Sequence, residues 1–77
     1  MFVGIYSPNK VIYEGETNSA TFPAVEGQIT ILNNHAPLIT YLKKGKIMIK
    51  LDYGYKEIEI EGGILHCNGE NEVKVIV

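Results

Sequence analysis

The chain contains no arginine, and all seven of its cationic side chains are lysines. With a formal net charge of −2, it lacks the basic surface of a nucleic-acid-binding protein, so no nucleic-acid partner is expected. The only cysteine is Cys67, which excludes an internal disulfide and fits a reducing compartment. No apolar run approaches the ~18 residues that a membrane-spanning helix needs. Any membrane association is therefore expected to go through a partner.

What the chain does contain is typical of one small folded domain covering residues 1–77, with 45% hydrophobic and 21% charged residues. The N-terminus shows no basic segment followed by a long apolar run, so no secretory signal is expected.

Apolar and polar residues alternate with a period of two, which is the pattern of strands with one dry and one wet face. The clearest cases are residues 45–51 and 55–61. A two-residue loop at Tyr53-Gly54 would join them as a hairpin. The predicted pairs are Lys50 with Glu57, Lys46 with Glu61, Ile49 with Ile58 and Ile47 with Ile60.

Further strands are expected at 2–6, 10–13, 16–22, 29–32, 38–42, 63–67 and 72–77. The segment 16–22 is rich in threonine and suits a sheet edge, and Gly62-Gly63 indicates a bend or bulge. No segment has a 3.6-residue period. The expected fold is all-β, a small antiparallel β-sandwich (a flattened barrel) of about eight to ten short strands.

No catalytic, cofactor or metal site is expected from the residues. His66 and Cys67 are neighbours in a strand and point to opposite faces, so they do not form a nucleophile–base pair. Two histidines and one cysteine do not make up the three or four convergent ligands of a zinc site. One alternative stays open: Lys50, in Ile47-Met48-Ile49-Lys50, faintly resembles the modified lysine of biotinyl and lipoyl carrier domains, although it lies two residues before the turn. A small enzyme is a third hypothesis, but the sequence displays no convergent polar cluster that would support it.

Four blocks of sequence occur in an order and spacing that resemble a known family. They are Ser7-Pro8 with Val11-x-Tyr13-x-Gly15, Phe22-Pro23-Ala24-x-Glu26-Gly27, His35-Ala36-Pro37-Leu38, and Gly62-Gly63-Ile64-Leu65. On these residues the chain resembles the N-terminal β-sandwich domain of the epsilon subunit of F-type ATP synthases.

The resemblance implies a non-catalytic rotor subunit in the central stalk, which takes part in ATP synthesis by coupling proton or sodium transport to rotation. Its partners would be the gamma shaft and the polar loops of the c-ring, at the cytoplasmic face of the energy-transducing membrane. The gamma-facing positions that it implies are Ser7, His35 and Thr40, and the c-ring-facing positions are Glu26, Gln28 and Ile29. Gln28 is neutral where many relatives are acidic.

Family members usually continue into a C-terminal helical hairpin that can block ATP hydrolysis. The present sequence stops at Val77, where the resembling sandwich ends, so no helical domain is expected within it. A naturally short protein and a trimmed one both remain open. A docking face would show as an exposed apolar patch, expected around Ile29, Ile31 or Pro37-Leu38.

Overall fold

The computed structural model describes all of residues 1–77, and its regular structure consists entirely of strands. The seven strands are β1 (Phe2–Tyr6), β2 (Val11–Glu16), β3 (Ser19–Ala24), β4 (Gly27–Leu32), β5 (Leu38–Leu51), β6 (Gly54–Cys67) and β7 (Glu72–Ile76). They form one sheet in the order β2-β1-β7-β6-β5-β3-β4. Neighbours are antiparallel except β1 and β7, which are parallel. No helix is present that could cross a membrane.

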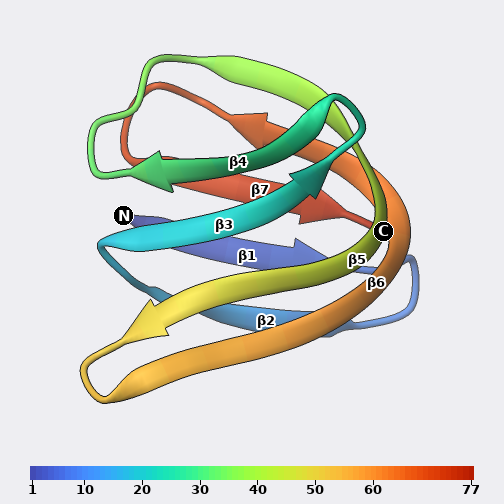
Figure 1. Cartoon of the computed structure of the whole chain (residues 1–77), viewed down its shortest axis with the longest axis horizontal. Coiled ribbons are helices and arrows are strands. Elements are labelled where there is room, and N and C mark those ends of the chain that lie inside the picture. The colour runs from blue at the N-terminus through green and yellow to red at the C-terminus, as the bar shows by residue number, and fades with distance from the viewer.

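The sheet becomes a sandwich because β5 and β6 are long, bent and shared by two layers. Figure 1 shows the two strands curving side by side around one edge of the molecule. The last residues of β6, 64–67, pair with β7, whereas β3 pairs with residues 42, 48 and 49 of β5. The first layer therefore contains β2, β1, β7 and the halves of β6 and β5 around residues 63–67 and 38–42. The second layer contains the other halves of β5 and β6 together with β3 and β4.

Glycines let these long strands bend without losing their partners. Gly62 and Gly63 have φ angles of 149° and 158°, and they remain paired with Lys43 and Leu42. The all-β sandwich is confirmed, and so is the bend at this glycine pair. The expected number of strands, eight to ten, was wrong. Residues 38–42 continue into 45–51, and 55–61 continue into 63–67, because bending at glycine costs less than breaking the hydrogen-bonded ladder.

The β5–β6 hairpin has a different register from the expected one. The loop consists of Asp52 and Tyr53, and Gly54, with φ 137°, already pairs with Leu51. Every predicted pair is therefore displaced by two residues: Ile47 faces Ile58. A shift of two equals the side-chain period of a strand, so the wet and dry faces were predicted correctly. Opposite charges still meet, because Lys46 Nζ lies 3.4 Å from Glu57 Oε1 across the diagonal.

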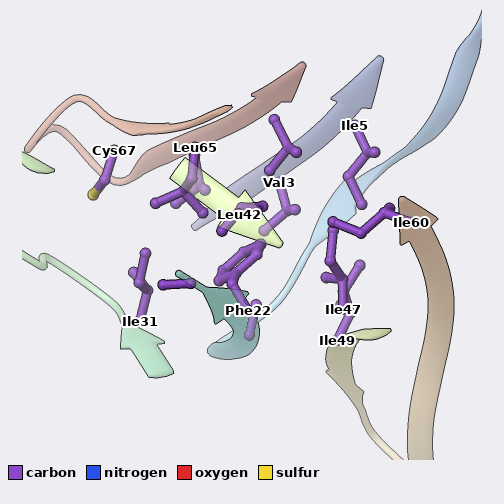
Figure 2. Packing of buried hydrophobic residues seen from close by; sticks show 14 of the residues in the cluster. Val3, Ile5, Phe22, Ile31, Leu42, Ile47, Ile49, Ile60, Leu65 and Cys67 are labelled. Carbon is purple, nitrogen blue, oxygen red and sulfur yellow. The ribbon is translucent and has the colours of Figure 1, made fainter. Parts of the chain in front are cut away.

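The core lies between the two layers and is almost wholly aliphatic around Phe22. Figure 2 shows its side chains converging from both layers. Its fully buried members include Val3, Ile5, Phe22, Ile31, Ile47, Ile49, Leu65, Val73 and Val75. Complete burial of such a side chain contributes about 1.5–3 kcal/mol relative to exposure. The expectation of an edge position for 16–22 was wrong, since β3 has β5 and β4 on its two sides and β4 is the edge.

Candidate functional site

The loop that contains His35 joins β4 to β5 at one end of the first layer, and we call residues 33–37 the His35 loop. It begins with a turn in which the His35 N–H donates to the Leu32 carbonyl at 3.3 Å. Asn34 takes the left-handed conformation, with φ 63°, that asparagine tolerates better than most residues. The half-buried His35 ring has its Nδ1 2.7 Å from the Ala36 carbonyl oxygen. Pro37 then fixes the entry into β5.

Ser7 and His35, both expected to face gamma, lie at opposite ends of the first layer. Ser7 follows the last residue of β1, where its N–H donates to the Lys10 carbonyl at 2.9 Å. The His35 loop lies beside the first residue of β1, because Asn71 accepts hydrogen bonds from both Phe2 N–H and Asn34 N–H. The five residues of β1 separate the two sites. Ser7 and His35 therefore lie at the two ends of one face and do not form a single cluster.

The third gamma position, Thr40, is brought next to the three expected c-ring positions. Thr40 pairs with the buried Leu65, so its side chain points to the inner side of the first layer. There it lines an open hollow of about 280 Å³ together with Glu26, Gln28 and Ile29. The structure thus groups these four positions beside the β3–β4 hairpin.

At the Ser7 end of the first layer, the outer face carries a row of apolar residues, whereas the next row toward the His35 loop contains His66, Lys74 and Glu14. Tyr41 pairs with Ile64, Ile64 with Ile76, Ile76 with Tyr6, and Tyr6 with Val11. These five residues form a row across five strands, which we call the apolar row. Tyr41 is 66% exposed and Ile76 54% exposed, and the neighbouring Ile39 is 69% exposed. A row of large exposed apolar side chains is the physical mark of a covered face.

The outer face of the second layer has ion pairs and hydroxyl groups in place of such a row. Lys46 and Lys44 contact Glu57 and Glu61 there, with N–O distances of 3.4 and 4.0 Å. Thr21 and Thr30 share a hydrogen bond of 2.9 Å between β3 and β4. All four ionic side chains are at least half exposed, so these pairs contribute little stability and keep the face hydrated. The contrast between the faces singles out the first layer.

Of the places expected for the apolar patch, Ile31 is buried in the core and Ile29 and Leu38 are half-buried, whereas Pro37 is exposed. The sequence does hold a signal for the apolar row. A strand with one solvated face alternates, yet Leu38–Leu42 and Val75–Val77 are apolar at both alternating positions. Such runs indicate strands that are covered on both sides.

One polar pair borders the apolar row. The Tyr6 hydroxyl donates a hydrogen bond of 2.8 Å to Glu14 Oε2. This bond, helped by desolvation and by the negative charges of Glu14 and Glu72, raises the pKa of Tyr6 above its ordinary value of 10.0. The Tyr6 ring lies folded over Gly4, so closely that an added Cβ would clash with its hydroxyl oxygen.

The remaining candidate residues are not arranged for chemistry. Cys67 is 2% exposed and its neighbour His66 is exposed, so the predicted divergence of their side chains is confirmed. Lys50 lies within β5 opposite Tyr55, while the hairpin tip is formed by Asp52 and Tyr53. The modified lysine of a carrier domain sits at a tip, so Lys50 does not have that geometry.

Comparison with known proteins agrees with this fold. Residues 1–77 match the family model described as "ATP synthase, Delta/Epsilon chain, beta-sandwich domain". The ATP synthase epsilon chain of Leptospira borgpetersenii is 38% identical over 74 residues, which are 96% of this chain and 58% of the relative. That of Synechocystis is 36% identical over 75 residues, or 97% of this chain and 54% of the relative. The chain spans about half the length of the curated relatives it matches.

Two solved structures share the fold at low sequence identity. One is the Euglena gracilis mitochondrial ATP synthase (OSCP/F1/c-ring), with a TM-score of 0.88, 21% identity, and coverage of 97% of this chain and 48% of that chain. The other is the Tetrahymena thermophila mitochondrial ATP synthase (central stalk/c-ring), with a TM-score of 0.81, 17% identity, and coverage of 99% and 61%. Since the family model covers every strand of the sandwich, the chain belongs to the delta/epsilon chain family of ATP synthases and represents its β-sandwich domain.

Proposed function

We propose that this chain is a non-catalytic rotor subunit of an F-type ATP synthase, which binds the gamma shaft and the c-ring. In this role it passes ion-driven rotation from the ring to the shaft and on to the catalytic head. It is held at the cytoplasmic face of the membrane by the complex alone. Membership of the delta/epsilon family supports the proposal, as do the F1/c-ring and central-stalk complexes in which its structural neighbours occur.

The observation that carries the proposal is the apolar row. Its exposed side chains, with Ile39 beside them, would be costly to leave in water, and a second protein covering them gains the hydrophobic free energy of their burial. Ser7 and His35 mark the two ends of this face. We assign the face to gamma, because a shaft that transmits torque needs a broad contact rather than a single anchor.

The end with Thr40, Glu26, Gln28 and Ile29 is assigned to the c-ring. These residues surround the open hollow beside the β3–β4 hairpin, and Glu26 and Gln28 are exposed. A carboxylate and an amide at a hairpin turn can accept and donate hydrogen bonds to polar loops. Thr40, expected to face gamma, opens on the same hollow, so it lies where the two interfaces would meet.

The test is calorimetric titration of purified gamma subunit with the unmodified chain and with matched lysine variants. Tyr41→Lys and Ile76→Lys place a charge in the apolar row, and Thr30→Lys places the same charge on the hydrated face of the second layer. We expect stoichiometric binding by the unmodified chain and by Thr30→Lys, and at least tenfold weaker binding by the two apolar-row variants. The variant His35→Ala tests the other end of the face assigned to gamma separately.

Because all three lysines are introduced at exposed or partly exposed positions, circular dichroism should show unchanged folding. Failure of the unmodified chain to bind gamma would contradict the proposed function. Equal weakening by all three lysine variants would contradict the assignment of gamma to the apolar row.

A further inference from the structure

The His35 loop is held in place from outside, at Asn33 by Met1 and Asn18 and at its later residues by the turn between β6 and β7. This turn comprises residues 68–71 and lies more than thirty residues further along the chain. It is itself ordered by Asn68, whose Oδ1 accepts hydrogen bonds from Glu70 N–H at 2.7 Å and Glu72 N–H at 3.2 Å. The turn is therefore a preformed support, and its contacts with the His35 loop have fixed positions.

Asn71 makes the polar contact with that loop. Its Oδ1 accepts the Asn34 N–H at 2.9 Å, directly before His35, and its carbonyl accepts the Phe2 N–H at 3.0 Å. Asn71 has φ 66°, so it combines a left-handed backbone with a side-chain acceptor, which few residues can do. One residue thereby ties the His35 loop to the start of β1.

Two more contacts lie on the other side of His35. The ring of Pro37 covers Gly69 so closely that an added Cβ would lie 2.5 Å from Pro37 Cγ. The buried Cys67 thiol points to the His35 carbonyl, with 3.8 Å between sulfur and oxygen. The His35 loop is thus held at Asn34, at His35 and at Pro37, all by residues 67–71.

We propose that Asn71 is a positioning residue for gamma binding, which orders the His35 loop through the Asn34 N–H before the partner arrives. This inference rests on the proposed function. A loop that is already ordered loses less conformational entropy on binding, so its support contributes to affinity without contacting the partner. The sequence offers no hint of this role, because Asn71 reads as an ordinary turn residue.

The experiment compares three substitutions in the same turn of the full chain. Asn71→Gly keeps the left-handed backbone and removes the acceptor, whereas Asn71→Asp keeps both. Glu70→Gln is the matched control, since only the backbone of Glu70 is hydrogen-bonded. Calorimetry with purified gamma measures affinity, and NMR measures hydrogen exchange of the Asn34 amide. We expect Asn71→Gly to bind gamma about three- to tenfold more weakly and to exchange the Asn34 amide faster. Asn71→Asp and Glu70→Gln should stay within about twofold of the unmodified chain.

The outcomes separate this inference from the proposed function. If the unmodified chain does not bind gamma, the proposed function fails, and the positioning role fails with it. If the unmodified chain binds and Asn71→Gly binds equally well, or weakens binding without faster exchange at Asn34, the positioning role alone is overturned. Recovery by Asn71→Asp would show that the acceptor matters and not the asparagine itself.

Discussion

Gly63 lies so close to the carbonyl oxygen of Ile76 that a Cβ added to it would be 2.5 Å away. The obstructing atom is backbone of β7 and cannot move aside, and the φ of 158° is itself unfavourable for other residues. We expect Gly63→Ala to lower the free energy of unfolding by about 2–4 kcal/mol, measured by urea denaturation.

Gly54 provides the control for that substitution. It also has a positive φ, 137°, but nothing lies within 4 Å of an added Cβ. Gly54→Ala should therefore lower the free energy of unfolding only through the unfavourable φ angle, by about 1 kcal/mol. Equal losses at the two glycines would show that close packing at the bend is unimportant.

Leu65 and Leu32 offer the same substitution at two extremes of burial. Leu65 is fully buried between the layers, and Leu32 is 57% exposed on β4. Leu65→Ala should destabilise the domain by about 2–5 kcal/mol, a large part of the stability of a chain this short. Leu32→Ala should cost less than about 1 kcal/mol. Thermal unfolding monitored by circular dichroism measures both, and similar melting temperatures would argue against the observed core.

Tyr6 and Glu14 should give the chain a pH dependence in the alkaline range. The hydrogen bond to the Glu14 carboxylate raises the pKa of Tyr6 in the folded state, so this contribution to stability is complete below the unfolded pKa near 10.0. It is lost as pH rises through the higher folded pKa. NMR titration of the Tyr6 ring should show a higher midpoint than in Glu14→Gln. An unchanged midpoint in that variant would rule out Glu14 as the main cause.

These 77 residues should leave ATP hydrolysis unhindered, because the resemblance assigns inhibition to a helical hairpin and this chain forms strands only. Added in equimolar amount to a catalytic head free of epsilon, the chain is expected to change the ATPase rate by less than about twofold, since docking alone adds no group to the catalytic sites. Strong inhibition at that ratio would mean that the sandwich itself acts as a brake. The variant Ile76→Lys, which should dock much more weakly, provides the baseline ATPase rate.

The sequence predicted those features that depend on neighbours along the chain. Alternation in 45–51 and 55–61 indicated two strands and correctly separated Ile47 and Ile58 from Lys46 and Glu57. Gly62-Gly63 likewise indicated a bend, which the structure has. The side-chain period and turn chemistry are local properties, so a single sequence contains them.

The tertiary structure alone decided what depends on distant partners. Whether Gly45 and Gly62 end a strand or bend it is set by the ladder opposite, which kept β5 and β6 continuous and reduced the strand count. The hairpin register followed the loop geometry, which displaced it by one full side-chain period. The separation of Ser7 from His35, and the support of the His35 loop by Asn71, result from placing β1 beside β7. Pairing between segments far apart in the chain is fixed by packing of the whole domain, and local patterns do not encode it.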